Sequence, residues 1–208
     1  MALPTVEILV APATEAFRAN PRDPAVVGPI LEVMNSCPGM IRTYYGVQHE
    51  DKVSAHVAVA WHSLADHQAL MNDPVKYPQV GKELQTVVDT SAIVMYHCAF
   101  TSEPYKALEA PVTEIVTITL NEGESKDTLE TLVDELSKGA NAAPASAGGA
   151  ISAAWGPAVE KDDLLFLIIG WPSVEAHTAT VKSNQAVMDI ISKIRAIAKL
   201  EVKHVALA

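Results

Sequence analysis

Histidine and tyrosine side chains on two neighbouring segments are the first candidates for chemistry in this sequence. His56 lies in an alternating segment, residues 53–61, and Tyr44 lies in the segment before it, residues 40–47. An imidazole titrates near neutral pH and can act as a base, while a phenol can orient a substrate oxygen. His56 and Tyr44 are therefore candidate catalytic residues, with His97 as a third further along the chain.

The faces of the predicted strands decide which side chains share a cavity. Alternate residues of a strand face opposite sides, so Ser54, His56, Ala58 and Ala60 share one face. That face is small and polar, which fits a cavity wall, and the alternative is that it meets solvent. Arg42 could neutralise an enolate or carboxylate, or be a surface charge. The residues expected to bind a ligand are Arg42, Tyr44, Tyr45, His56, Tyr96 and His97.

Spacing along the sequence offers no motif for a metal, a phosphate or an activated nucleophile. His97 and Cys98 are adjacent on a predicted strand and so face opposite sides. His62 and His67 are five residues apart and do not stack on one helical face. Residues 141–150 have the composition of a loop, without the strand-then-helix order of a phosphate cradle. We therefore expect no metal and no other cofactor.

One short motif occurs twice. "AWHSLADH", residues 60–67, recurs as "GWPSVEAH", residues 170–177. Its Trp, Ser and His each reappear 110 positions later, and a Glu and a second His recur at an offset of 107. Such regular recurrence predicts an internal duplication. The recurring residues are Trp61, Ser63, His67, Glu7 and His97, matched by Trp171, Ser173, His177, Glu114 and His204.

Recurrence also bears on function. Packing residues persist in both copies of a duplicated fold, whereas catalytic groups often survive in only one. We therefore interpret the repeated Trp, Ser and His as the corner between a strand and a helix. Function is expected where the halves differ, which is at His56 against Phe166 and at Tyr45 against Trp155.

Each half contains the same order of elements, strand, helix, strand, strand, helix, strand. This order is the ferredoxin-like unit, whose sheet carries helices on one face only. The bare face must be covered, and two such sheets facing one another within one chain would cover both. We predict an α+β fold with a first repeat at residues 1–104, a linker at 105–111 and a second repeat at 112–208. The predicted strands are 5–12, 40–47, 53–61, 91–100, 113–120, 148–158, 163–171 and 200–207.

Composition narrows the classes of partner. The chain has 208 residues, of which 49% are hydrophobic, and its net charge is −10. An acidic surface argues against nucleic acid and anionic membranes, because both attract Lys and Arg patches. The longest strongly apolar run, residues 164–171, is far shorter than the roughly 20 residues of a membrane span. Two cysteines and no apolar leader favour a cytoplasmic protein with reduced thiols.

The half-repeat, with Ala-Trp-x-Ser opening the helix after the third strand, resembles the antibiotic-biosynthesis-monooxygenase type of dimeric α/β barrel. The tandem arrangement resembles two-repeat members found in fungi, and the resemblance covers essentially the whole chain. It implies a small, mostly apolar pocket between sheet and helices or inside the barrel. For haem-degrading members of this family, the resemblance implies an Asn on the first strand and, on a helix, a Trp and a His ten residues apart. Met71 and Val181 stand ten residues beyond Trp61 and Trp171, so haem degradation is not expected.

Two functions remain open from the sequence. The leading hypothesis is a protein that binds a small hydrophobic or aromatic metabolite, such as a pigment, without a cofactor. The alternative is a cofactor-independent polyketide cyclase or monooxygenase acting on a phenolic substrate, with His56 or His97 as base and Tyr44 or Tyr45 as the orienting group. A structural or stress-related protein with a vestigial pocket is a third possibility, and a second copy of the chain stays open as a partner.

Overall fold

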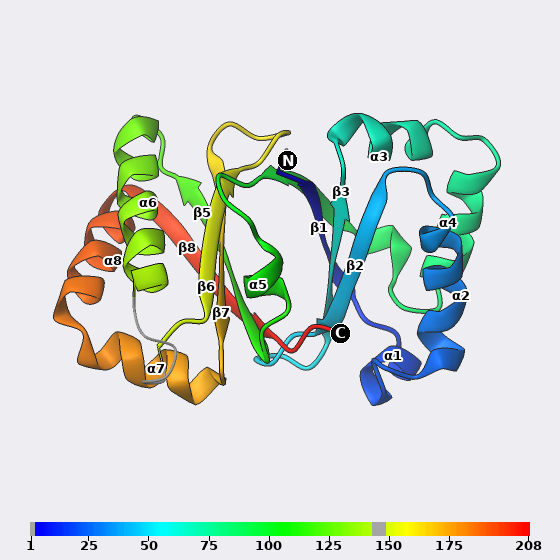
Figure 1. Cartoon of the computed structure of the whole chain (residues 1–208), viewed down its shortest axis with the longest axis horizontal. Helices are drawn as coiled ribbons and strands as arrows, with labels where there is room; N and C mark the ends of the chain where they lie inside the picture. Colours follow the sequence, from blue (N-terminus) through cyan, green and yellow to red (C-terminus); the bar gives the residue numbers. More distant parts are fainter. Residues whose placement is uncertain (1–2, 143–148) are drawn as a thin grey trace. The chain divides into compact units, whose positions relative to one another are not determined.

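The duplication predicted from the sequence is visible in the backbone. The structure, a computed structural model, describes residues 3–142 and 149–208. The chain divides into two compact units, residues 1–99 with residue 208, and residues 100–207. Each unit contains a four-stranded antiparallel sheet with helices packed on it (Figure 1).

The first unit orders its strands β2-β3-β1-β4, so the first and third strands of the chain form the centre of the sheet. A short α1, which the sequence patterns did not indicate, precedes the main helix, and a 3-10 turn at Thr90–Ala92 precedes the closing strand. The elements are β1 (Thr5–Pro12), α1 (Glu15–Ala19), α2 (Pro24–Asn35), β2 (Met40–Val47), β3 (Ser54–Trp61), α3 (Leu64–Met71), α4 (Lys76–Leu84) and β4 (Val94–Ala99).

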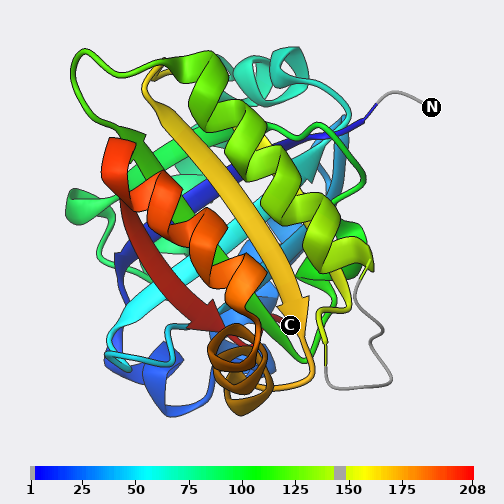
Figure 2. The ribbon, with the colours of Figure 1, turned by 90° about the vertical axis from the view of Figure 1, so that its left-hand side faces the viewer.

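The second unit repeats this topology with the order β6-β7-β5-β8. The predicted fold of two ferredoxin-like repeats is therefore confirmed. Figure 2 shows α6 and α8 side by side over the sheet of this unit. Residues 143–148, within the predicted loop 141–150, lie outside the described residues. The elements are α5 (Tyr105–Leu108), β5 (Val112–Leu120), α6 (Lys126–Ala142), β6 (Ser152–Pro157), β7 (Leu164–Trp171), α7 (Val174–Ser183), α8 (Gln185–Ile197) and β8 (Ala198–Val205).

The repeated motif starts a helix directly after a strand in both units. The hydroxyl of Ser63 accepts a hydrogen bond from the Asp66 N–H, and the hydroxyl of Ser173 accepts one from the Ala176 N–H. Such caps satisfy backbone donors that the first turn of a helix leaves unpaired. Gly39, at φ 79°, lies against this corner, and a Cβ there would come 2.4 Å from the Asp66 Cβ. The motif therefore sets where each helix begins and how it leaves the sheet.

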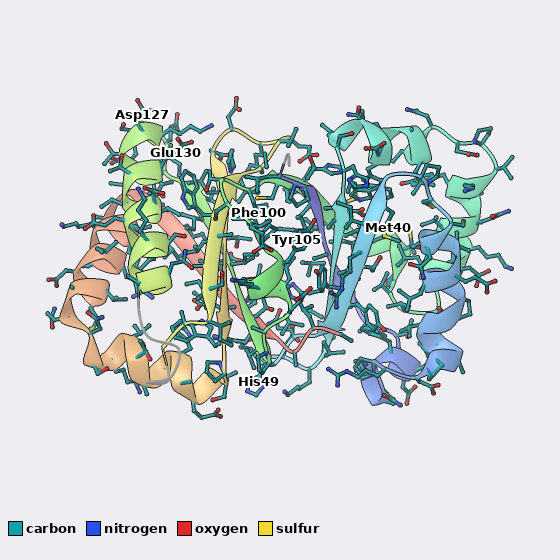
Figure 3. The ribbon with its side chains drawn as sticks, in the orientation of Figure 1. Met40, His49, Phe100, Tyr105, Asp127 and Glu130 are labelled. Atoms are coloured by element: carbon teal, nitrogen blue, oxygen red, sulfur yellow. The ribbon has the colours of Figure 1, made fainter. Side chains whose placement is uncertain are left out.

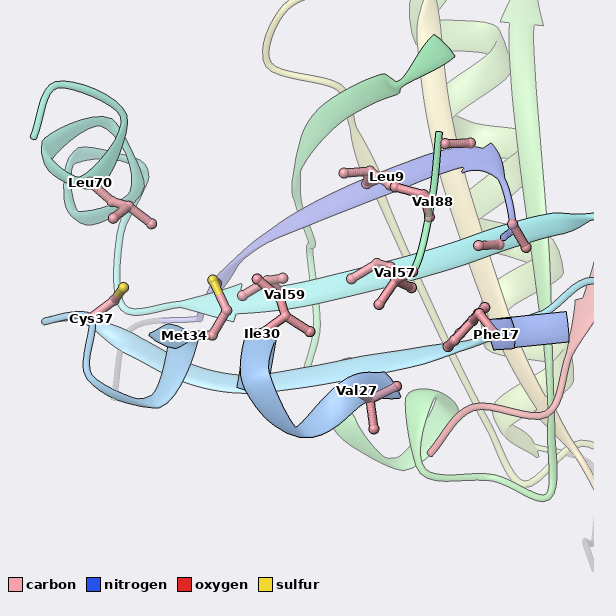
Figure 4. Packing of buried hydrophobic residues seen from close by; sticks show 14 of the residues in the cluster. Leu9, Phe17, Val27, Ile30, Met34, Cys37, Val57, Val59, Leu70 and Val88 are labelled. Atoms are coloured by element: carbon pink, nitrogen blue, oxygen red, sulfur yellow. The ribbon is translucent and has the colours of Figure 1, made fainter. Parts of the chain in front are cut away.

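One face of each sheet packs against the helices to form a core. In the first unit this core contains the fully buried Phe17 (Figure 4). The fully buried Trp61 belongs to the same core. In the second unit Leu129 and Val133 of α6 pack on Leu167. Asp127 and Glu130 are polar residues near the start of α6 (Figure 3), where acidic groups stabilise a helix. The apolar side of α6 therefore faces the sheet.

The segment 105–111, predicted as a linker, contains a helix. The Tyr105 N–H donates to the Glu103 carboxylate at 2.6 Å, and this starts α5. α5 packs on β6 and β7, where Ala107 and Ala110 lie against Gly170. The segment is thus part of the second unit.

Both cysteines, Cys37 and Cys98, are buried and free of disulfides. Across the described residues, no helix combines the length and the apolar character that a membrane crossing needs.

Candidate functional site

Four polar and aromatic side chains meet at one end of the first sheet, and we call Glu7, Trp61, His67 and His97 the first cluster. Trp61 Nε1 donates a hydrogen bond to Glu7 Oε2 at 3.2 Å, and His67 Nε2 lies 3.5 Å from the same oxygen. His67 Nδ1 lies 2.7 Å from His97 Nε2. The Trp61 and His67 rings stack, with centroids 4.7 Å apart and planes 11° apart. The four groups form one continuous chain of contacts.

The second unit contains the same arrangement, and we call Glu114, Trp171, His177 and His204 the second cluster. Trp171 Nε1 donates to Glu114 Oε2 at 2.7 Å, and His177 Nε2 lies 3.6 Å from that oxygen. His177 Nδ1 lies 2.8 Å from His204 Nε2. The Trp171 and His177 rings are tilted by 35° rather than stacked.

Strand register and the helix cap bring these residues together. Glu7 is directly paired with His97 across β1 and β4, and Glu114 is paired with His204 across β5 and β8. Paired residues point to the same face of a sheet. Ser63 caps α3 just beyond β3, which places His67 in the helix over the end of that strand. The repeated corner therefore also builds the cluster.

Burial governs the protonation of the first cluster. Glu7, His67 and His97 are each less than a tenth exposed. Burial raises the pKa of Glu7 from its ordinary 4.5 to about 7, although the hydrogen bond from Trp61 opposes the rise. The carboxyl is thus close to half protonated at neutral pH, next to an imidazole.

The second cluster is more open. The His177 side chain is 16% exposed, compared with 5% for His67. Burial, followed by the charge on His204, lowers the pKa of His177 to about 4. His177 is therefore neutral at physiological pH, with one ring nitrogen able to donate and the other able to accept.

One Glu and one His of each cluster line a cavity between the sheet and helices of their unit, and Trp171 also lines the second cavity. The cavity of the second unit has a volume of about 330 Å³, and that of the first unit about 280 Å³. Both are walled mainly by apolar side chains. The second cavity is lined by Glu114, Trp171, His177, Thr180, Val202 and others, and the first by Glu7, Val57, Val59, His67, Leu70, Tyr77 and others.

The residues predicted to bind a ligand divide between the two faces of the first sheet. His97 and Tyr45 lie on the helix-covered face, where His97 joins the first cluster and the Tyr45 ring lies 6.3 Å from Phe17 in the core. The opposite face has the other four, which the structure does not bring to the cavity. These are Arg42, Tyr44, His56 and Tyr96.

The expected cavity wall on β3 is on the other side of the strand. Val57 and Val59 line the cavity, and His56 points to the opposite face. The predicted alternation of side chains along β3 is correct, but which face of the strand packs against the helices depends on tertiary structure. His56 Nε2 lies 3.1 Å from Gln48 Oε1, and the Arg42 guanidinium lies 4.9 Å from the centre of the Tyr44 ring. The alternative that this face meets solvent is wrong, because His56 is 3% exposed.

Sequence reasoning missed the carboxylates and undervalued the repeated histidines. Glu7 and Glu114 are the acidic residues in otherwise apolar strands, and their recurrence at an offset of 107 was the available signal. Spacing along the sequence did not indicate the group of Glu114, His177 and His204, which offer ligand atoms within 4.8 Å of one another. Spacing misses this group because its members come from two strands and a helix.

Comparisons with known proteins bear on the fold. No family model and no curated protein matches the sequence. The chain is similar to a candidate monooxygenase from Fusobacterium nucleatum subsp. nucleatum, with a TM-score of 0.71, 6% identity and coverage of 99% of this chain and 93% of that one. A candidate monooxygenase from Lactobacillus acidophilus gives a TM-score of 0.67 at 12% identity, covering 99% and 94%. An anthrone oxidase-like protein gives 0.64 at 10% identity, covering 99% and 91%.

These identities are low, so the similarity shows the fold alone. The chain has the two-repeat α+β fold of these monooxygenase-like proteins.

Proposed function

We propose that each repeat binds one small, mostly apolar molecule in the cavity between its sheet and its helices. The observation that carries this proposal is the recurrence in both units of an apolar-walled cavity lined by one Glu and one His of its cluster, Glu7 with His67 and Glu114 with His177. Apolar walls with a few convergent polar groups are typical of small-molecule sites. The walls provide affinity, and the cluster selects ligands with a hydrogen-bonding group at one end.

A hydroxylated aromatic molecule fits this chemistry best. Its ring would pack against Val57 and Val59 or against Val202, and its hydroxyl would reach His67 or His177. A pigment or a related aromatic metabolite belongs to this class. The anthrone oxidase-like protein of similar fold supports the assignment, as does the resemblance to two-repeat fungal members of the antibiotic-biosynthesis-monooxygenase type.

Catalysis is the second candidate function, and the first cluster favours it. Glu7, His67 and His97 form a buried chain in which a proton taken up by His67 can be shared with either neighbour. His67 lines the cavity, so it is placed to remove a proton from a phenol or enol. A cofactor-independent cyclase or monooxygenase would begin with this step. His97 then acts as a positioning residue, in place of the role as base expected from the sequence.

A paired titration tests the binding proposal. Isothermal calorimetry with 1-naphthol and with naphthalene compares two ligands that differ by one hydroxyl. We expect 1-naphthol to bind more tightly, by about tenfold, which corresponds to about one hydrogen bond. His67→Asn with His177→Asn should remove this preference, and His56→Ala should leave it unchanged. Equal affinity for the two ligands, or loss of the preference in His56→Ala alone, would contradict the proposal.

A further inference from the structure

We propose that the second cluster is a binding site for a divalent first-row transition metal ion. The ligands are Glu114, His177 and His204, and the remaining coordination positions face the cavity. This goes beyond the proposed function, because the site would bind the ion whether or not an aromatic ligand is present.

The separation of the ligand atoms supports the site. All three residues offer atoms within 4.8 Å of one another. His177 Nδ1 and His204 Nε2 are 2.8 Å apart. Two nitrogens that each bind an ion at about 2.1 Å lie roughly 3 Å apart when their bonds meet near a right angle.

The types of ligand select the kind of ion. Imidazole suits zinc, iron, cobalt, nickel and copper, whereas magnesium and calcium prefer oxygen ligands. Two His and one carboxylate occupy one side of an ion and leave further positions open. Glu114 and His177 line the apolar cavity, so those positions would face the space that holds a small molecule.

Surrounding groups hold the carboxylate in place. The indole of Trp171 donates to Glu114 Oε2 at 2.7 Å, as outer partners of metal-binding carboxylates do. Glu114 is 5% exposed, and a cation would offset the cost of burying its charge. The cationic Arg195 also lines this cavity, but its side chain is exposed and solvent screens it.

The first cluster offers a matched control within the same chain. Among the described residues, only Glu114, His177 and His204 offer three ligand atoms that all lie within 4.8 Å of one another, and Glu7, His67 and His97 do not. His67 lies flat against Trp61 and is less exposed than His177. Substitutions in the first cluster should therefore leave metal binding unchanged.

The test is calorimetric titration of the full chain, freed of metal with EDTA, with Zn²⁺. We expect one tight equivalent per chain, and at least a tenfold loss of affinity in Glu114→Gln and in His204→Asn. Glu7→Gln and His97→Asn should bind as the wild type does. No tight equivalent, two equivalents, or equal losses in the two clusters would overturn the proposal.

A second measurement needs no variant and so does not depend on whether the substituted chains fold. Zinc K-edge X-ray absorption of the wild-type complex should show two imidazole ligands with low-atomic-number scatterers completing the shell. A shell without imidazole would overturn the proposal. Titration of the metal-free chain with 1-naphthol keeps this result separate from the proposed function.

Discussion

The two clusters use the same four residue types but differ in how the first histidine is packed. His67 lies parallel to Trp61 and is nearly closed off, whereas His177 is tilted from Trp171 and about three times as exposed. One turn further along the helix, the first unit has a buried Leu70 and the second has the smaller Thr180. Duplication has therefore kept the polar groups, while changes around them set how far each one opens to its cavity.

The two clusters also differ in which group has a shifted pKa. In the first cluster the group whose pKa moves toward neutrality is the carboxyl of Glu7, and in the second the pKa of His177 moves away from it. The first cluster is thus better suited to exchanging a proton near pH 7, and the second to offering the uncharged imidazole of His177. This division matches the acid–base role proposed for the first unit and the metal-binding role proposed for the second.

The largest expected effect concerns the charge on Glu7. Its pKa is raised on folding, so the folded chain holds the proton more tightly than the unfolded chain does. The stability from this group is full below pH 4.5 and is lost as the pH rises through about 7. Glu7→Gln should therefore gain about 3 kcal/mol over the wild type between pH 4 and pH 8, at 1.36 kcal/mol per pKa unit. Urea denaturation at a series of pH values measures this difference.

Glu122→Gln is the control for the Glu7 experiment, because Glu122 is exposed and lies in a turn outside the helices. Its stability should follow that of the wild type across the pH series. If the difference between Glu7→Gln and the wild type did not change with pH, the carboxyl would titrate normally. The acid–base role of the first cluster would then lose its support.

Much of the fold could be predicted because it depends on local patterns and on repetition. Ser63 and Ser173 marked the two helix starts, and matched offsets placed the strands of the second repeat on those of the first. The sequence did not indicate α5 within the predicted linker, since four helical residues leave no periodic pattern. After Trp171 the chain forms two helices, α7 and α8, which meet at Asn184, and the Asn184 side chain caps α8.

The site was harder to predict because it is assembled from distant residues. Every member of the clusters was noticed as a repeated residue, but apart from the candidate site residue His97 the repetition was interpreted as packing. Glu7 and His97 are 90 positions apart and meet only through the pairing of β1 with β4. The face of β3 that meets the helices is likewise set by tertiary packing, and so His56 was placed beside a cavity that Val57 lines.

An intermediate loss of stability is expected from a substitution on the face of the second sheet opposite the cavity. Gly170 occupies the position that Ala60 has in the first repeat. A Cβ at Gly170 would lie 2.7 Å from the Ala110 Cβ and 3.0 Å from the Ala107 Cα, because α5 packs there. Gly170→Ala should therefore destabilise the chain by about 2 kcal/mol through overpacking. Thermal unfolding measures it, and restored stability in Gly170→Ala with Ala110→Gly would identify the clash as the cause.

The smallest expected effect is a change in ligand affinity, and it tests directly how the two cavities differ. Thr180→Leu should close the second cavity over His177 and weaken 1-naphthol binding there by about threefold to tenfold, or roughly 1 kcal/mol. Leu70→Thr should open the first cavity over His67 and strengthen the contribution of the ligand hydroxyl. Calorimetry on the two variants, with naphthalene as the reference ligand, separates the polar effect from the change in volume. Each substitution could instead change the affinities for 1-naphthol and naphthalene by the same factor. Cavity size would then explain the result, and the exposure of the histidines would not distinguish the two repeats.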